Sequence, residues 1–338
     1  MRDFHCQCGA RVFFHNSRCL NCGLSLGFDP QRLQMRSLRV EGAWRVDDSD
    51  GKRFRYCRNQ RDYGACNWLL PEGEHKPYCI SCRLNRTVPD LSGAENIGRW
   101  IKLEEAKRHL LYSLLSLGLA LTPANNRGVN LAFAFLEDAR TNPDMAESFI
   151  ATGHKSGLIT INLAEADDLY RERVREELGE HYRTILGHFR HEIGHYYYEI
   201  LVADSQWRES FETLFGDPQT DYGEALNRYY ALSPSADWHK AYISNYAQAH
   251  PLEDWAETWA HYLHIVDTLE TATTFGLISR DAEPGDMDAI LSEWLELSVG
   301  LNALNRSMGL ADAYPFVITP AVRDKLNLVH RVIRNLTS

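Results

Sequence analysis

The chain has 338 residues, of which 44% are hydrophobic and 24% charged, a composition typical of a globular protein and not of a disordered or fibrous one. Its formal net charge of −10 is unevenly distributed: residues 1–90 hold 15 Lys/Arg against 10 Asp/Glu, and the remainder holds 21 against 36. Two Zn²⁺ ions bound by eight cysteine thiolates would reduce the basic excess of the first part to roughly +1. Charge is therefore a weak argument for a nucleic-acid partner.

The sequence shows no segment that would target the chain to a membrane. Its first residues lead directly into cysteines, without the apolar stretch of a secretory signal. The longest apolar run, residues 110–121, is shorter than the roughly 20 residues that span a bilayer, and we interpret it as a core helix. We expect a cytoplasmic protein with no membrane contact, in which reduced cysteines more often hold metal than form disulfides.

All eight cysteines precede residue 83 and fall into two sets of four. Each set has the two-plus-two pattern of a closed structural zinc site, so we predict two structural Zn²⁺ ions. Both sets depart from the commonest spacing, which leaves open a pairing between the sets, or cysteines that are simply buried or disulfide-bonded. The first set is Cys6, Cys8, Cys19 and Cys22, and the second is Cys57, Cys66, Cys79 and Cys82.

The cysteines mark an N-terminal β module over residues 1–90. Between the two sets, residues 37–56 alternate in polarity around the turn signal at residues 48–51, which predicts a β-hairpin. A Pro- and Gly-containing stretch at residues 88–93 marks the end of the module. We expect a second, catalytic domain over residues 95–338.

The second domain begins with a helical pattern from residue 95. Two strand-like segments, residues 129–136 and 157–163, then interrupt the helices. From residue 167 the chain is mostly helical, with loops near residues 216–218 and 283–285. A small sheet followed by long helices predicts an α+β fold.

A predicted long helix over residues 169–202 carries the motif His191-Glu192-Ile193-Gly194-His195. Histidines four apart lie one turn apart on one helix face, so both imidazoles can bind one catalytic Zn²⁺. Glu192 can then act as general base toward a water whose pKa the zinc lowers to about 7. Such a pattern also arises by chance on a solvated helix, but apolar and aromatic residues flank this one, which indicates a buried helix.

The strongest source of a third zinc ligand is the segment 251–261, PLEDWAETWAH. Glu253 and Glu257 share one helix face, and two carboxylates on a buried face are costly unless they are paired or metal-bound. We assign Glu253 to the zinc and Glu257 to orienting a ligand histidine. The reverse assignment stays open, Asp254 and His261 are weaker candidates, and an amphipathic helix with solvated acids is the plain alternative.

These residues resemble the gluzincin metallopeptidases, and the later segment is most similar to the lethal-factor branch, where a glutamate opens an E-x-x-A-E-x-aromatic pattern. Here that pattern is EDWAETW, residues 253–259. In that branch a tyrosine seven residues before the glutamate stabilises the oxyanion, and Tyr246 stands at this spacing. Tyrosine is abundant in this chain, so Tyr246 can also be an ordinary loop residue.

The whole chain resembles the bacterial zinc-binding metallopeptidases that carry an N-terminal zinc ribbon. The matching stretches are CLNCG at residues 19–23, CISCRLN at 79–85, the His191 motif, and EDWAETWAHYLH at 253–264. The resemblance implies a zinc-ribbon module followed by a mainly helical, zincin-like peptidase domain with a small sheet.

We therefore expect peptide-bond hydrolysis with one catalytic and two structural Zn²⁺ ions, a peptide or protein substrate, and zinc ribbons that recruit substrate or a protein partner. The strand at residues 157–163 is a candidate sheet edge for pairing with an extended substrate. Other histidines near the motif, His188, His250 and His264, are expected to be structural or to support the metal ligands.

A second hypothesis makes the chain a binding protein with a regulated or inactive zincin scaffold. Glu192 favours the enzyme, because a scaffold needs no general base. A zinc-dependent hydrolase of a non-peptide amide is a third possibility, since zinc and a carboxylate serve both reactions. The residues to suspect for nucleic-acid binding are Arg53, Arg55, Arg58 and Arg61 with Tyr56 and Tyr63.

Overall fold

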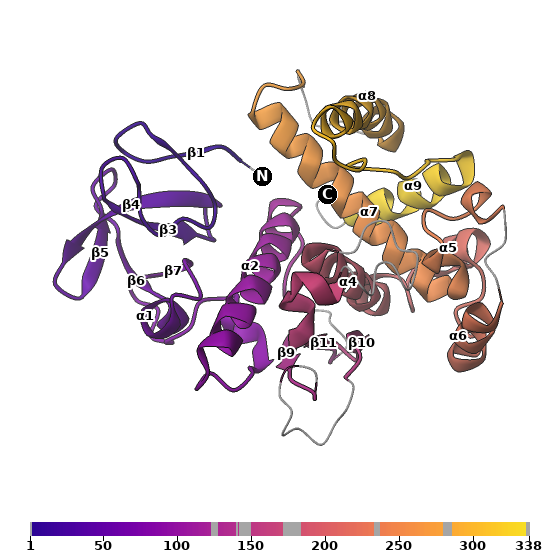
Figure 1. Cartoon of the computed structure of the whole chain (residues 1–338), viewed down its shortest axis with the longest axis horizontal. Coiled ribbons are helices and arrows are strands. Elements are labelled where there is room, and N and C mark those ends of the chain that lie inside the picture. The colour runs from indigo at the N-terminus through magenta and orange to yellow at the C-terminus, as the bar shows by residue number, and fades with distance from the viewer. Residues whose placement is uncertain are drawn as a thin grey trace. The chain divides into compact units, whose positions relative to one another are not determined.

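The computed structural model describes residues 2–122, 128–139, 141, 150–171, 184–232, 237–279 and 286–335. The chain divides into two compact units: residues 2–121 with 131–170, and residues 122–130 with 171–338. A cysteine-rich β module comes first, and a mostly helical part with a small sheet follows (Figure 1). The predicted α+β class is confirmed.

The β module is built on a five-stranded antiparallel sheet whose strands follow chain order. The predicted turn at residues 48–51 joins its third and fourth strands. A second tight turn at Gly42, with φ 57°, joins the second and third, so the segment 37–56 holds three strands and not one hairpin. The strands are β3 (Ser25–Asp29), β4 (Gln34–Glu41), β5 (Trp44–Asp47), β6 (Arg53–Tyr56) and β7 (Leu69–Pro71), with a small pair β1 (Phe4–His5) and β2 (Arg11–Val12) before them and α1 (Arg58–Tyr63) after β6.

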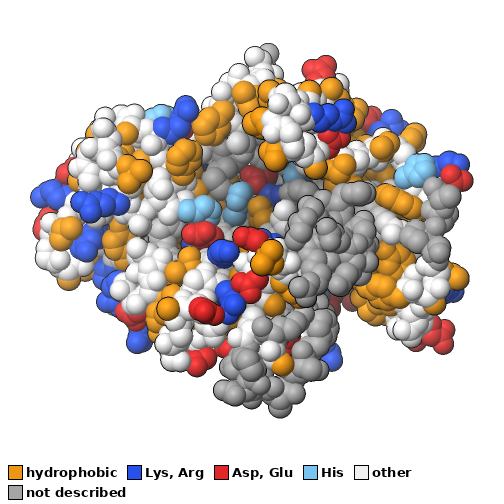
Figure 2. Space-filling model, in the orientation of Figure 1, with side chains coloured by type: hydrophobic (Ala, Val, Ile, Leu, Met, Phe, Trp, Pro, Cys, Tyr) orange, Lys and Arg blue, Asp and Glu red, His pale blue; other side chains and the backbone are white. Residues whose placement is uncertain are grey.

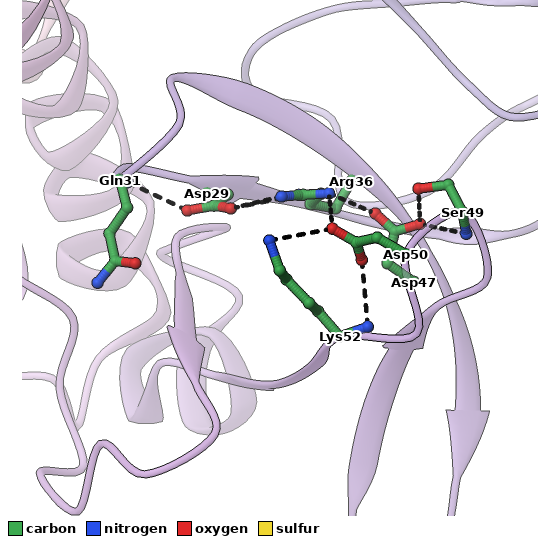
Figure 3. A network of polar contacts seen from close by, with 7 residues as sticks. All are labelled: Asp29, Gln31, Arg36, Asp47, Ser49, Asp50 and Lys52. Atoms are coloured by element: carbon green, nitrogen blue, oxygen red, sulfur yellow. Dashed lines mark hydrogen bonds and ion pairs between the residues drawn. The ribbon is translucent and has the colours of Figure 1, made fainter.

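A buried arginine ties three segments of this sheet together (Figure 3). The Arg36 guanidinium on β4 lies 3.0 Å from Asp29 on β3, 3.0 Å from Asp47 on β5 and 3.1 Å from Asp50 in the following turn. The Arg36 side chain is only 5% exposed, so these carboxylates replace its water. The network fixes β3, β4 and the turn after β5 in one arrangement.

The first unit also contains a four-stranded sheet in the order β10-β11-β9-β8. Strand β11 (Leu158–Asn162) lies between β10 (Gly153–Lys155) and β9 (Ala132–Leu136), and it runs parallel to β9. The prediction that residues 157–163 form a sheet edge is therefore wrong, because both sides of β11 are already paired. The edges are β10 and β8 (Asn85–Thr87).

Helix α2 (Ala94–Ser116) confirms the helix predicted from residue 95 and belongs to the same unit. Leu103, Leu110 and Leu114 on this helix are fully buried, so the apolar run that starts at residue 110 belongs to the core. Within the described parts of the chain, no helix is long and apolar enough to cross a membrane.

The second unit is helical. Its described helices are α4 (Ile185–Leu201), α5 (Arg208–Phe215), α6 (Tyr222–Ala231), α7 (Pro251–Thr274), α8 (Met287–Ser307) and α9 (Pro320–Arg334), with short 3-10 turns η3 (Trp238–Lys240) and η4 (Tyr246–Ala249) before α7. The loop predicted at residues 216–218 lies between α5 and α6. The loop predicted at residues 283–285 falls outside the described residues.

The helix that carries the His191 motif is shorter than predicted. Thr184 is extended, with φ −117° and ψ 156°, and its hydroxyl accepts a hydrogen bond of 2.9 Å from the Gly187 N–H. This is an N-cap, so α4 begins at Ile185 and the prediction of one helix over residues 169–202 is wrong. Residues 172–183 lie outside the described residues.

Helices α4 and α7 pack closely against each other at Gly194. A Cβ atom added there would lie 3.0 Å from the Ala256 Cα and 3.1 Å from the Trp259 Cβ, so a side chain at this position would force its neighbours to shift. The Trp255 indole N–H donates a 2.9 Å hydrogen bond to the Gly194 carbonyl across the same contact. The contact brings the motif helix and the glutamate-bearing helix together directly before His195.

Candidate metal centres and active site

The eight cysteines form two clusters, the first four and the last four in the chain, so each predicted set stays together. In the first, the Cys6 and Cys22 sulfurs are 3.5 Å apart and those of Cys8 and Cys19 3.7 Å. Four sulfurs around one Zn²⁺ at about 2.3 Å lie roughly 3.8 Å apart, whereas a disulfide bond is about 2.05 Å long. The spacing fits tetrahedral zinc and excludes disulfides within these pairs.

The two cysteine clusters differ in burial. In the first cluster Cys8 and Cys22 are exposed, whereas all four cysteines of the second are buried. Backbone N–H groups point at the sulfurs of the second cluster, for example Trp68 N–H to Cys66 at 3.4 Å. The buried Arg108 guanidinium of α2 lies beside this cluster. Burial lowers the Arg108 pKa, but the charges of the cysteines and of Glu104 outweigh burial and raise it. This positive charge offsets part of the charge of a four-thiolate zinc site.

The third cluster joins α4 to the first turns of α7. The Nε2 atoms of His191 and His195 are 3.2 Å apart, and Glu253 carboxylate oxygens lie 3.0 Å from His191 Nε2 and 3.5 Å from His195 Nε2. Ligands about 2.1 Å from one tetrahedral Zn²⁺ would stand roughly 3.4 Å apart. Two imidazoles and one carboxylate at this spacing could hold a metal ion, and three protein ligands of these types leave a fourth position of a tetrahedral zinc open.

The electrostatics of this cluster also fit a cation. Glu253 is 1% exposed, and its buried Oε2 atom faces His191 Nε2 at 3.0 Å. Burial lowers the pKa of His191, but Glu253 and Glu257 outweigh it and raise this pKa well above its ordinary value. Burial raises the pKa of Glu253, but His195 and His191 hold it well below its ordinary value. A buried carboxylate aimed at two imidazole nitrogens requires positive charge, which a divalent ion supplies.

Two further glutamates complete this cluster. Glu257 Oε1 lies 2.6 Å from His191 Nδ1, on the ring edge opposite to the nitrogen that faces Glu253. With Nδ1–H donating to Glu257, the lone pair of Nε2 points to the cluster. Glu192 is 8% exposed. Burial raises the Glu192 pKa, and this effect outweighs the charges of His191 and His195, which lower it. A buried carboxylate with a raised pKa is suited to hold a proton.

Two tyrosines lie beside the cluster. The Tyr246 ring is 5.9 Å from the His191 ring, and burial raises the Tyr246 pKa. Tyr222 on α6 donates a 2.8 Å hydrogen bond from its hydroxyl to Glu253 Oε1. Sequence reasoning missed Tyr222, because it lies 31 residues before Glu253 in an ordinary helical pattern.

The weaker ligand candidates have other partners. Asp254 pairs with Lys325 at 2.6 Å; burial raises the Asp254 pKa to about 7 and Lys325 opposes this. His261 Nδ1 lies 2.9 Å from the Tyr314 hydroxyl, and burial lowers the His261 pKa to about 4. His250 accepts from the backbone N–H two residues on and so caps α7.

The arginines suspected of nucleic-acid binding are largely engaged within the β module. Arg53 pairs with Glu41 at 2.7 Å and Arg58 with Asp62 at 2.8 Å, while Arg55 donates to a backbone carbonyl. On the face that Figure 2 shows, several blue basic side chains lie near one another in the region of β4 and β5, with red and orange atoms beside them. These ion pairs offset part of the basic charge of the module.

Two four-cysteine clusters and a His-His-Glu cluster on a tightly packed helix pair are the kinds of donor set found in zinc-binding proteins. The chain belongs to the family described as "Putative zinc-binding metallo-peptidase", whose profile matches residues 96–332, and residues 3–93 match the zinc-ribbon domain family. The predicted resemblance to these peptidases with an N-terminal zinc ribbon is confirmed.

The relatives found are uncharacterized proteins of Mycobacterium bovis and of two Mycobacterium tuberculosis strains. Each is 41% identical to this chain over 343 residues, which cover 98% of the chain and 95% of the relative. No solved structure matches the chain.

Proposed function

We propose that the protein hydrolyses peptide bonds at a zinc site held by His191, His195 and Glu253, with Glu192 as general base. The observation that carries the proposal is the convergence of two Nε2 atoms and a buried carboxylate within 4.8 Å. A Zn²⁺ bound there would supply Lewis-acid chemistry, polarising the scissile carbonyl and making a water acidic. The two cysteine clusters would hold the structural Zn²⁺ ions.

The side chains around the cluster have separate tasks in this proposal. Glu192 accepts the proton of the attacking water at its carboxylate and returns it to the leaving amine. Tyr246 donates its hydroxyl proton as a hydrogen bond to the oxyanion. Glu257 holds the His191 ring through Nδ1, and Tyr222 holds the Glu253 carboxylate through Oε1, so both act by positioning ligands.

The geometry favours Glu253 over Glu257 as the ligand. Glu253 faces the Nε2 atoms of both histidines, whereas Glu257 contacts His191 at Nδ1. The zinc-ribbon module would recruit a peptide or protein substrate or a partner. Its clusters require reduced thiols, which fits a cytoplasmic setting.

The proposal is tested by measuring bound zinc and peptide-library cleavage for the native chain and for Glu192→Gln. We expect about three zinc ions in both proteins, counting two four-cysteine sites and one His-His-Glu site, and cleavage by the native chain alone. Glu296→Gln, at an exposed position on α8, is the control and should cleave like the native chain. Equal cleavage by Glu192→Gln and the native chain would refute the role of Glu192, and a count of two zinc ions would remove one site.

A further inference from the structure

A pocket of about 420 Å³ lies beside the metal cluster within the helical unit. This volume is in the range of ligand pockets, roughly 300 to 1,000 Å³. Its aromatic lining comes from α5, α6 and the segment before α7. The residues that the argument uses are Phe215, Ala225, Arg228, Tyr229, Tyr242 and Asp254.

Aromatic rings connect this pocket to the proposed reaction centre. Tyr229 lines the pocket, and its ring lies 5.8 Å from that of Tyr246. The Tyr246 ring in turn lies 5.9 Å from that of His191. An extended peptide advances about 3.3 Å per residue, so a side chain in the pocket would belong to a residue within about four positions of the bond at the metal.

One polar atom at this pocket has no partner. Asp254 is 1% exposed, and its Oδ1 atom is buried without a hydrogen bond. The other oxygen, Oδ2, accepts a 2.6 Å hydrogen bond from Lys325, which does not line the pocket. Lys325 also donates a 2.8 Å hydrogen bond to the Ala241 carbonyl. Lys325 therefore occupies one side of the carboxylate, and Asp254 itself lines the pocket, so a small rotation of the carboxyl group would present Oδ1 to a ligand there. Leaving such an atom unpaired is costly, which points to a ligand that satisfies it.

The charges around the pocket select against an ionic ligand. Lys325 already neutralises Asp254, so a ligand cation would add a net positive charge near Arg228, which also lines the pocket. A ligand anion would have to approach the buried Asp254 carboxyl. A neutral polar group avoids both the repulsion between a cation and Arg228 and the repulsion between an anion and the Asp254 carboxyl.

We propose that this pocket binds a tyrosine side chain of the substrate, with the phenol hydroxyl on Asp254 Oδ1. The ring would pack against the aromatic walls of Phe215, Tyr229 and Tyr242. A phenol can both donate and accept, so it pairs with this oxygen whether or not the carboxyl carries a proton. The inference rests on the proposed peptidase function, which makes a peptide the ligand.

The test compares blocked pentapeptides of alanine that carry Tyr, Phe, Lys or Glu at the central position. Their binding to the zinc-loaded Glu192→Gln protein is measured by calorimetry, so that cleavage does not interfere. The Tyr peptide should bind about ten- to a hundredfold more tightly than the Phe peptide, the value of one hydrogen bond to a buried charged group. Equal binding of Tyr and Phe, or tightest binding of Lys or Glu, would overturn the proposal.

Two variants test whether the preference for the Tyr peptide arises in this pocket. Asp254→Leu combined with Lys325→Met removes the buried pair as a unit, which proteins often tolerate, and the Tyr peptide should then bind only as well as the Phe peptide. Ala225→Phe fills the pocket instead and should weaken both peptides. A Tyr preference that persists in both variants would place the phenol elsewhere.

The binding test separates this proposal from the proposed function. A native protein that prefers the Tyr peptide in binding but cleaves none of the peptides would retain the pocket and refute the peptidase. A native protein that cleaves Tyr and Phe peptides equally, with equal binding, would retain the peptidase and refute the pocket.

Discussion

The contact at Gly194 predicts that one added methyl group weakens zinc binding. In Gly194→Ala the new Cβ would lie 3.0 Å from the Ala256 Cα and 3.1 Å from the Trp259 Cβ. Carbon atoms in contact prefer about 3.5–4.0 Å, and backbone and Cβ atoms cannot rotate away, so α4 and α7 must move apart by a few tenths of an ångström. Overpacking of this kind costs about 1–3 kcal/mol.

The same separation acts on the metal cluster, because His191 and His195 lie on α4 and Glu253 on α7. Metal–ligand distances tolerate only about 0.2 Å of change. We expect Gly194→Ala to weaken zinc at this site by about tenfold or more, while the cysteine clusters keep their zinc. A competition titration with a chelator, read together with the melting temperature, measures both effects.

Gly300→Ala is the matched control, because Gly300 lies within α8 and an added Cβ meets nothing within 4 Å. Alanine in a helix interior is favoured over glycine by about 0.5–1 kcal/mol, so this variant should melt at or above the native temperature with native zinc affinity. If Gly194→Ala behaves like Gly300→Ala in both measurements, the close helix contact does not assemble the site.

Three further predictions concern Glu257, the Arg36 network and the cysteine clusters. Glu257→Gln should lower the affinity of the His-His-Glu site for zinc about 10- to 100-fold, because the amide holds the His191 ring less firmly. The same chelator titration measures this, the cysteine sites should be unchanged, and an unchanged affinity would refute the positioning role of Glu257. Arg36→Met should destabilise the β module by about 3–5 kcal/mol in denaturant unfolding, because it leaves buried carboxylates unpaired, whereas the exposed Arg39→Met should have little effect. Under mild oxidation the first cysteine cluster should release its zinc before the second, because Cys8 and Cys22 are exposed, and simultaneous release detected with a metal indicator would contradict this.

The parts of the fold that the sequence predicts well are those with a local signal. Helix α2 follows its apolar spacing, and the turn at residues 48–51 follows its Asp and Gly residues. The turn at Gly42 has a weaker signal, and the prediction merged β4 with β5. The helix over residues 169–202 was predicted as continuous because periodicity does not reveal that Thr184 turns its hydroxyl to cap a new start.

The order of strands in a sheet, unlike the position of a turn, has no local signal in the sequence. Alternation identified the strand at residues 157–163, but its place between β9 and β10 depends on partners distant in sequence. An edge strand and an interior strand of a small sheet have the same pattern of buried residues, so sequence periodicity cannot separate them.

At the metal cluster, the sequence predicts the candidate ligands but not the residues that position them. His191 and His195 are fixed by one helix turn, and the two carboxylates on one buried helix face suggested Glu253. Tyr222 hydrogen-bonds Glu253 from α6, and no spacing rule connects the two residues. The ligands follow a short sequence pattern because neighbouring ligands must lie on one face of a helix. A residue that positions a ligand can come from any element that packs nearby. The sequence therefore predicts the candidate ligands, and the packing of α4, α6 and α7 supplies the residues that hold them.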